Sequence, residues 1–139
     1  MASAAPVLLL EQTDSTNAEA RRRAEAGETG PLWIIARRQT AGRGRRGRAW
    51  ESDTGNLFAT LLTTTRKPPS LVTIKWPNDV LVAGDKASGV LVESGVHSSG
   101  GLWLAVGIGV NLARAPVGTE RPATALVHHL RGASTSPRR

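Results

Sequence analysis

The sequence predicts a strand-rich α/β domain that contains one clear helix. Short apolar runs recur along the chain, and clusters of glycine, proline or asparagine separate them, which is typical of β-strands joined by turns. One stretch, Ala18 to Ala26, consists instead of the helix formers alanine, glutamate and arginine. A length of 139 residues with 40% hydrophobic residues suits a single domain with a modest core. We find no internal repeat.

The first half of the chain alternates between apolar runs and polar connections. Val7 to Leu10 predicts the first strand. Thr13 to Asn17 follows, and capping the next helix is the simplest role for these side chains. Gly27 is a suitable end for that helix. Trp33 to Ala36 and Asn56 to Thr63 predict the second and third strands.

Turn residues divide the second half. Thr64 to Ser70 contains two prolines and predicts a turn, after which Leu71 to Lys75 resumes a strand pattern. Val80 to Val82 and Gly89 to Glu93 flank the turn at Ala83-Gly84-Asp85, as in a β-hairpin.

The C-terminal part contains one more strand pattern. Leu102 to Ile108 is an apolar run, closed by Gly109-Val110-Asn111. Thr124 to Leu130 resembles the start of a helix that Gly132 ends. We therefore expect one folded domain at residues 1–130 and a disordered basic tail at residues 131–139.

Composition and charge limit the classes of function. The formal net charge is +7 and there is no cysteine, so disulfides and thiolate metal sites are excluded. No apolar stretch reaches membrane-spanning length, and the first six residues lack the pattern of a signal peptide, so we expect a cytoplasmic protein. A basic chain raises nucleic acid as a partner. The scarcity of aromatic residues, however, provides a poor platform for base stacking.

The segment from Gln39 to Trp50 is the most unusual part of the sequence. It holds Arg43, Arg45, Arg46 and Arg48 interleaved with three glycines, directly after an apolar run. Glycine lets a backbone approach a ligand closely, and arginine pairs with carboxylate or phosphate oxygens in bidentate fashion. Three interpretations stay open: a flexible anion-binding loop at an active site, an arginine-rich nucleic-acid segment, or a solvated surface loop.

Other polar motifs are weaker. Lys75-Trp76-Pro77-Asn78-Asp79 follows a predicted strand, where proline would fix the directions of the two polar side chains, although an ordinary turn also suits them. Lys86 is either functional or an exposed hairpin lysine. Gly107-Ile108-Gly109 does not match the dinucleotide fingerprint. The three histidines, His97, His128 and His129, lack a second ligand at metal spacing, and we expect all three at the surface.

Taken together, these stretches resemble the catalytic domain of the biotin protein ligases, also called biotin–[acetyl-CoA-carboxylase] ligases. Six motifs in the family's order carry the resemblance over roughly residues 7 to 130. They are Thr13 to Asn17, Gln39 with Ala41 to Trp50, Gly55 to Leu57, Lys75 to Val80, Lys86 to Glu93 and Gly107 to Leu112.

The resemblance implies an α/β (α+β) fold: a mixed β-sheet with flanking helices, like class II aminoacyl-tRNA synthetases and biotin ligases, in shortened form. It implies that biotin and Mg-ATP form biotinoyl-5′-AMP. The biotinoyl group then passes to a lysine of a biotin carboxyl carrier protein of acetyl-CoA carboxylase or a related carboxylase. The cofactors and substrates implied are biotin, ATP and Mg²⁺.

The resemblance also assigns roles to residues of this chain. Catalysis would fall to Lys86, Arg45 and Arg43. Biotin would be bound by Ser15, Thr16, Asn17, Gln39, Gly42, Arg43, Arg45, Lys86 and Gly89. The nucleotide side would comprise Arg46, Arg48, Trp50, Asn56, Lys75, Asn78, Asp79 and Asn111. No metal ligands are assigned, and Asp79 would either orient its neighbours or assist at the metal.

The chain differs from the family pattern in three places. The family has a long amphipathic helix between the third and fourth strands, and Thr64 to Ser70 is too short to hold one, so we expect apolar side chains to be exposed on the sheet. The family's C-terminal barrel domain and the DNA-binding domain of its repressor members are not expected here. A homologue that binds biotin or its adenylate without transfer, and an arginine-rich nucleic-acid-binding module, remain the alternatives.

Overall fold

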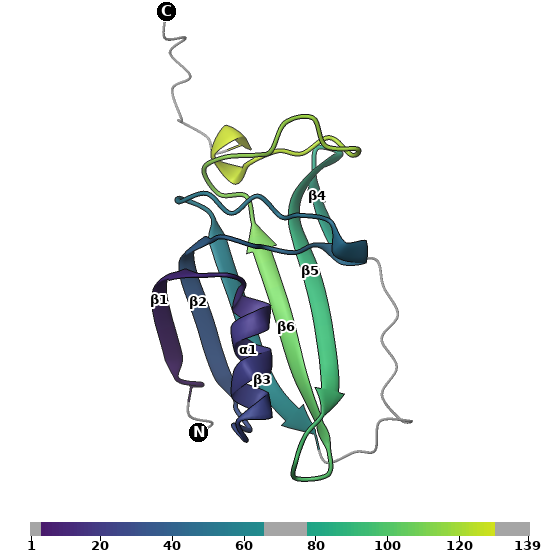
Figure 1. Cartoon of the computed structure of the whole chain (residues 1–139). Helices are drawn as coiled ribbons and strands as arrows, with labels where there is room; N and C mark the ends of the chain where they lie inside the picture. Colours follow the sequence, from purple (N-terminus) through teal and green to yellow (C-terminus); the bar gives the residue numbers. More distant parts are fainter. Residues whose placement is uncertain (1–3, 66–77, 130–139) are drawn as a thin grey trace, which may run out of the picture.

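The computed structural model describes residues 4–65 and 78–129, which form a mixed six-stranded sheet with one α-helix across it (Figure 1). The strand order is β1-β2-β3-β6-β5-β4, and the pair β1–β2 alone is parallel. The strands are β1 (Val7–Thr13), β2 (Leu32–Gln39), β3 (Leu57–Thr65), β4 (Asp79–Val82), β5 (Asp85–Val96) and β6 (Leu102–Val110), and the helix is α1 (Thr16–Glu25). The predicted α/β class is confirmed.

Helix α1 provides the crossover that parallel strands β1 and β2 require. Ser15 is its N-cap: the residue is extended, and its hydroxyl accepts a hydrogen bond from Ala18 N at 3.4 Å. The helix ends at Glu25 with Ala26 as its C-cap, and Gly27 follows with φ +98°. The predicted cap and stop are therefore confirmed.

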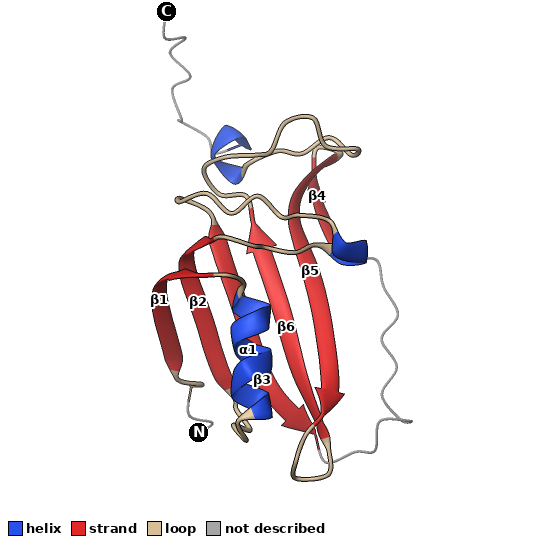
Figure 2. Cartoon of the chain, in the orientation of Figure 1, coloured by secondary structure: helices blue, strands red, loops and turns tan. Residues whose placement is uncertain are grey.

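The core lies between α1 and one face of the sheet, the face on which the helix is drawn in Figure 2. Ala20 and Ala24 of the helix pack against buried side chains of β2, β3 and β6. Because alanine is small, the helix axis can approach the sheet closely. The sheet residues of this core are Ile34, Leu62, Trp103 and Ala105.

The opposite face of the sheet is also apolar. One row of cross-strand neighbours is Leu9, Ile35, Ala59, Ile108 and Val90, and the next is Val7, Trp33, Leu61, Val106 and Val92. Within residues 4–65 and 78–129 no α-helix packs on this face, and Val7 and Leu9 are 60% and 53% exposed. The expectation of exposed apolar side chains agrees with this. The predicted strand Leu71 to Lys75, and most of the predicted turn before it, lie outside the described residues.

The hairpin between β4 and β5 forms as predicted, with Ala83 and Gly84 as a two-residue turn. Both have positive φ (51° and 87°), as the right-handed twist of paired strands favours. The helix expected from Thr124 onward is shorter: it is a 3₁₀ turn at Leu126–His129. No helix in the described ranges is long and apolar enough to cross a membrane.

The prediction that all three histidines lie at the surface is wrong for His97, which is 3% exposed. One ring nitrogen lies 2.7 Å from the Ser99 hydroxyl and the other 3.1 Å from the Glu28 carbonyl oxygen. The ring therefore joins the β5–β6 connection to the segment after α1, a long-range contact that local sequence does not reveal. His128 and His129 are exposed, as predicted.

Candidate active site

A small cavity of about 40 Å³ lies at the N-terminus of α1, on the helix-covered face of the sheet. Its floor is formed by neighbouring positions of β5 and β6, where Gly107 pairs with Leu91 and Gly109 with Gly89. A Cβ atom at Gly107 would collide with the Asn17 amide. Glycine is therefore required here so that α1 can place a polar side chain directly on the sheet.

The polar groups around the small cavity are hydrogen-bonded to one another. The Thr60 hydroxyl, fully buried on β3, lies 2.8 Å from Thr16 Oγ1 and 2.7 Å from Asn17 Oδ1. The Gln39 side-chain oxygen accepts from Thr16 N at 2.8 Å. The Asn17 amide donates to Leu91 O and to the Glu93 carboxylate. The predicted biotin-binding residues Ser15, Thr16, Asn17 and Gln39 are thus brought together.

The arginine-rich segment between β2 and β3, which we call the Arg loop (Gln39–Trp50), is closed by its own backbone. Trp50 N donates to Gly42 O at 2.8 Å, and Gly44 N donates to Arg48 O at 2.7 Å. At its tip Arg46 has φ +58°, in the left-handed region that non-glycine residues rarely adopt. The loop is therefore folded as a hairpin by its own backbone hydrogen bonds.

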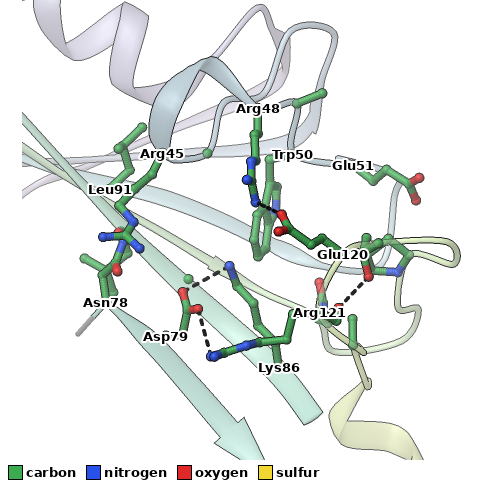
Figure 3. Close-up of a pocket in the computed structure, with 18 of the residues that line it drawn as sticks. Arg45, Arg48, Trp50, Glu51, Asn78, Asp79, Lys86, Leu91, Glu120 and Arg121 are labelled. Carbon is green, nitrogen blue, oxygen red and sulfur yellow. Dashed lines mark hydrogen bonds and ion pairs between the residues drawn. The ribbon is translucent and has the colours of Figure 1, made fainter. Parts of the chain in front are cut away.

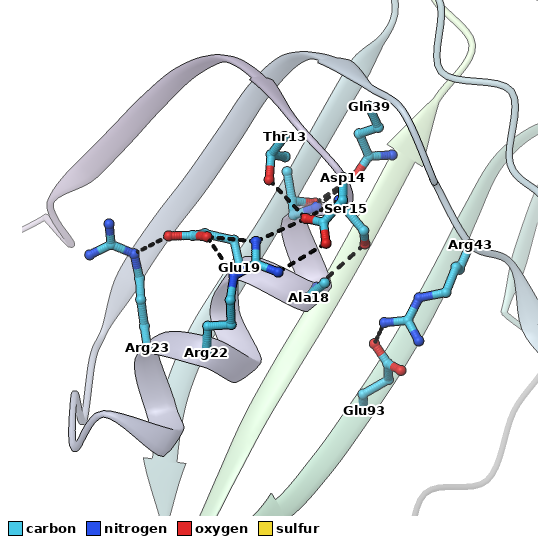
Figure 4. A network of polar contacts seen from close by, with 11 residues as sticks. Thr13, Asp14, Ser15, Ala18, Glu19, Arg22, Arg23, Gln39, Arg43 and Glu93 are labelled. Carbon is cyan, nitrogen blue, oxygen red and sulfur yellow. Dashed lines mark hydrogen bonds and ion pairs between the residues drawn. The ribbon is translucent and has the colours of Figure 1, made fainter.

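The arginines of the loop divide between two regions. Arg43 lines the small cavity and pairs with Glu93 at 3.0 Å (Figure 4). Arg45, Arg46 and Arg48 line a large cavity of about 1020 Å³ instead. The structure therefore places Arg45 away from the small cavity, although it lies on the same loop as Arg43.

Trp50 stands between the two cavities and lines both. Its indole lies on the glycine pair of β5 and β6, so a Cβ at Gly109 would come within 2.7 Å of the ring nitrogen. The indole N–H is buried and has no hydrogen-bond partner in the part of the chain that the structure describes. A buried donor without a partner is costly, so this N–H is available to a ligand that enters beside it.

The large cavity is lined by charged side chains from the Arg loop, β4, β5 and the segment after β6 (Figure 3). The basic residues are Arg45, Arg46, Arg48, Lys86 and Arg121, and the acidic residues are Glu51, Asp79 and Glu120. Arg48 pairs with Glu120 at 2.6 Å, which joins the Arg loop to the segment after β6. The excess of basic groups suits an anionic ligand.

Lys86 is at the centre of this charged group (Figure 3). Its ammonium lies 3.0 Å from the Asp79 carboxylate and 5.2 Å from the centre of the Trp50 ring. The second Asp79 oxygen lies 3.6 Å from Arg121. Lys86 is thus a partly buried cation of the large cavity, next to the Trp50 ring, rather than a solvated hairpin lysine, and it does not line the small cavity.

The side chains of the three asparagines predicted on the nucleotide side form hydrogen bonds to backbone groups. Asn78 donates to Val90 O at 3.0 Å, and Asn111 donates to Thr124 O at 3.3 Å; both line the large cavity. Asn56 lies outside both cavities. Its side-chain oxygen accepts from three consecutive backbone N–H groups, those of Leu112, Ala113 and Arg114. Gly42 lines neither cavity, and Lys75 lies outside the described residues.

Asp14 anchors the junction of β1 and α1 (Figure 4). Its carboxylate accepts two hydrogen bonds from Arg22, each 2.9 Å, and one from Ser15 N at 2.8 Å. The hydrogen bonds from Arg22 hold the pKa of the Asp14 carboxyl well below its usual range. Burial raises the pKa of Glu19, but hydrogen bonds from Arg22 and Arg23 outweigh it, so this pKa is also lowered.

Sequence reasoning missed several residues of the site. Thr60 and Glu93 belong to the hydrogen-bond network around the small cavity, while Glu120 and Arg121 line the large cavity. Thr60 was detectable as a polar residue inside an apolar strand. Glu93 was detectable as a charge in an otherwise apolar run. The described residues contain no group of three or more acidic or histidine side chains that could hold a metal.

Comparison with known proteins gives one family. The sequence model of the Biotin/lipoate A/B protein ligase family matches residues 9–70 and 63–111. A biotin–[acetyl-CoA-carboxylase] ligase of Paracoccus denitrificans is 42% identical, over 78% of this chain and 55% of the relative. The ligase of the same name from Mycobacterium tuberculosis is 32% identical, over 84% and 53%. The chain thus spans about half the length of these relatives.

Solved structures show the same fold. A biotin protein ligase from Aquifex aeolicus in complex with biotin and ATP has a TM-score of 0.68 and 30% identity, covering 89% of this chain and 60% of that one. The Leishmania major enzyme in complex with biotinyl-5-AMP has a TM-score of 0.71 and 29% identity, over 89% and 64%. Since the family match runs from β1 to the end of β6, this chain belongs to the biotin/lipoate A/B protein ligase family.

Proposed function

We propose that this chain is a biotin protein ligase. It activates biotin with ATP to biotinoyl-5′-AMP and transfers the biotinoyl group to a lysine of a carboxyl carrier protein. The observation that carries the proposal is the position of Lys86, which lines the large cationic cavity beside Trp50, the side chain that also lines the small cavity of mostly neutral polar groups. The relatives named above as ligases, and the solved structures with biotin, ATP or the adenylate, support it.

The two cavities suit the two ends of the adenylate. The hydroxyls and amides of Ser15, Thr16 and Gln39 match a neutral ureido ring, which needs partners for its buried donors and acceptors. The basic walls of the large cavity match phosphates. Ligand cavities usually measure roughly 300–1,000 Å³. The small cavity therefore has to widen before biotin can enter, and we propose that it does so by movement of Trp50, which lines both cavities.

The first half-reaction needs charge neutralisation more than covalent help from the protein. A biotin carboxylate oxygen attacks the α-phosphorus, the bond to the β-phosphate oxygen breaks, and pyrophosphate leaves. We propose that Lys86 stabilises the negative charge that develops in this step. Arg43, from the small cavity, and Arg45, from the large one, would hold the carboxylate between them. In the second half-reaction the carrier lysine attacks the biotinoyl carbonyl carbon and AMP leaves.

Magnesium would be bound in this site mainly by the phosphates of ATP. Mg²⁺ usually binds through one or two carboxylates together with substrate phosphates and shields their charge. Asp79 is the carboxylate beside Lys86, and it also pairs with Arg121. We propose that Asp79 keeps the Lys86 ammonium directed into the large cavity and assists the ion when Mg-ATP is bound.

The structure gives little support to the alternative of a nucleic-acid-binding module. Several arginines are already paired with carboxylates: Arg43 with Glu93, and Arg48 with Glu120. A nucleic-acid surface would present unpaired cations to phosphates and bind any polyanion with strong salt dependence. We propose instead that the carrier is an acidic carboxylase domain and that both act in the cytoplasm.

The direct test is to incubate the purified chain with biotin, ATP and Mg²⁺ and to look for biotinoyl-5′-AMP by mass spectrometry. We expect the adenylate to appear with wild-type protein and with Arg38→Ala, which removes one exposed cation away from both cavities. A folded wild-type sample that binds biotin but forms no adenylate would support a binding homologue. A sample that binds polyanions and ignores biotin would support the nucleic-acid module.

A further inference from the structure

Ser52 lies behind the small cavity without lining it. The residue is 8% exposed and follows the Arg loop by two positions. Its hydroxyl accepts a hydrogen bond from Gln39 Nε2 at 3.0 Å and donates one to Trp50 O at 2.9 Å. A serine hydroxyl has one donor and two acceptor sites, so both bonds form together.

The Gln39 amide is held at both ends. Its oxygen accepts from Thr16 N at 2.8 Å and from Thr16 Oγ1 at 3.2 Å, while its nitrogen donates to Ser52. Rotating the amide by 180° would exchange oxygen and nitrogen and break the bonds at both ends. The Thr16 N–H, which can only donate, and the Ser52 hydroxyl, whose proton goes to Trp50 O, therefore together fix which amide atom faces α1. The second N–H of Gln39 has no partner within the described part of the chain and remains for a ligand.

The Arg loop packs closely on the hydrogen bond between Ser52 and Gln39 and further restricts the position of both side chains. A Cβ atom at Gly42 would collide with Ser52 Oγ and come within 2.8 Å of Gln39 Nε2. The bond between Ser52 and Gln39 thus forms only because a glycine covers it. The first glycine of the loop is explained by this contact, since Gly42 lines neither cavity.

We propose that Ser52 is a positioning residue for biotin, acting through Gln39. This inference rests on the proposed function, because it names the ligand of the small cavity. By holding the Gln39 amide in one orientation, Ser52 presents a fixed donor to the ureido ring. Through its bond to Trp50 O it also ties the end of the Arg loop to the same amide.

The test compares Ser52→Ala with Thr64→Val. The Thr64 hydroxyl also donates to a backbone carbonyl (Thr29 O, 3.0 Å), and neither residue of this pair lines a cavity. We expect Ser52→Ala to weaken biotin binding by calorimetry about tenfold, as loss of one well-placed hydrogen bond does. ATP affinity should change by less than about twofold. Ser52→Thr, which keeps the hydroxyl, should restore most of the loss, and Thr64→Val should leave biotin affinity unchanged.

A double-mutant cycle separates positioning from general support. If Ser52 acts through Gln39, then Ser52→Ala should add nothing to the biotin affinity lost in Gln39→Ala. Additive losses, or equal losses of biotin and ATP affinity, would overturn the proposal. If Ser52→Ala does not fold, Ser52→Cys gives the same comparison, since it keeps a side chain of the same connectivity and replaces the hydroxyl with a thiol that hydrogen-bonds only weakly. Wild-type protein that binds no biotin would instead refute the proposed function itself.

Discussion

The two cavities are built in opposite ways. The small cavity rests on a regular sheet and a capped helix, and most of its polar groups are neutral and hydrogen-bonded to each other. The large cavity is lined by the Arg loop and the segment after β6 as well as by β4 and β5, and it contains largely exposed ion pairs such as Arg48 with Glu120. Buried, paired neutral groups fix a shape, whereas exposed ion pairs contribute about 1 kcal/mol or less each and rearrange easily. The ligands that we propose, a rigid ring in the small cavity and a flexible nucleotide in the large one, would call for this difference.

Loss of Lys86 tests the large cavity most severely. Lys86→Ala should lower the rate of adenylate formation by about 1000-fold, as removal of a positioned charge at a reacting centre does. Biotin binding should remain largely intact, because the small cavity keeps its hydrogen bonds. Calorimetry with biotin alone and single-turnover formation of the adenylate measure the two effects. Equal loss of both would mean that Lys86 binds biotin rather than stabilising the reaction.

Gly107→Ala tests the small cavity. The added methyl group collides with the Asn17 amide, so the Asn17 side chain has to leave Thr60 and Glu93. We expect biotin affinity to fall about thirtyfold and stability to fall by about 1–3 kcal/mol.

Gly95→Ala is the matched control for Gly107→Ala. Its methyl group would come within 2.6 Å of the Trp103 indole, in the core and away from both cavities. It should lower the unfolding temperature to a similar extent and leave the biotin affinity of the folded protein unchanged. If both variants lose biotin affinity equally, the glycine floor has no special role in the cavity.

The sequence predicts the strands, turns and helix cap that surround the two cavities better than it predicts the cavities themselves. The Ser15 cap, the β4–β5 turn and the strands follow from local patterns. The meeting of Thr60, Gly107 and Asn17 depends on the register between β3 and β6, which pairs Thr60 with Gly107 across 46 intervening residues. The burial of His97 and the backbone role of Asn56 are long-range in the same way.

Arg43 is the charge that links the two regions, since it lines the small cavity on a loop that also walls the large one. Arg43→Ala should speed release of the bound adenylate about tenfold, because the Arg loop loses its ion pair with Glu93 on β5. Retention of the adenylate in a chase with excess unlabelled biotin and ATP measures this rate. Unchanged retention would remove this ion pair from the mechanism.

The smallest effect we predict concerns pH. Ser15, Thr16, Asn17 and Gln39 do not titrate, so biotin affinity should stay nearly constant between about pH 5 and 8. The frame of the small cavity does depend on pH, through Asp14. Because the folded-state pKa of Asp14 is lowered, its stabilisation is complete above the unfolded pKa of about 4 and is lost as pH falls through the folded-state value.

Asp14→Asn removes this pH-dependent term. Asp14 is about half-exposed, so we expect the variant to be less stable than the wild type at pH 7 by at most about 1 kcal/mol. The difference should begin to shrink as pH falls below about 4, where the carboxyl of the unfolded wild-type chain takes up a proton, and should disappear below the lowered folded-state pKa. Asp53→Asn is the control, because Asp53 is exposed and forms no ion pair with a residue in the described ranges. Thermal unfolding of the three proteins at several pH values measures the effect. A stability difference between wild type and Asp14→Asn that stays constant down to acid pH would show that the charge of Asp14 is not what stabilises the fold.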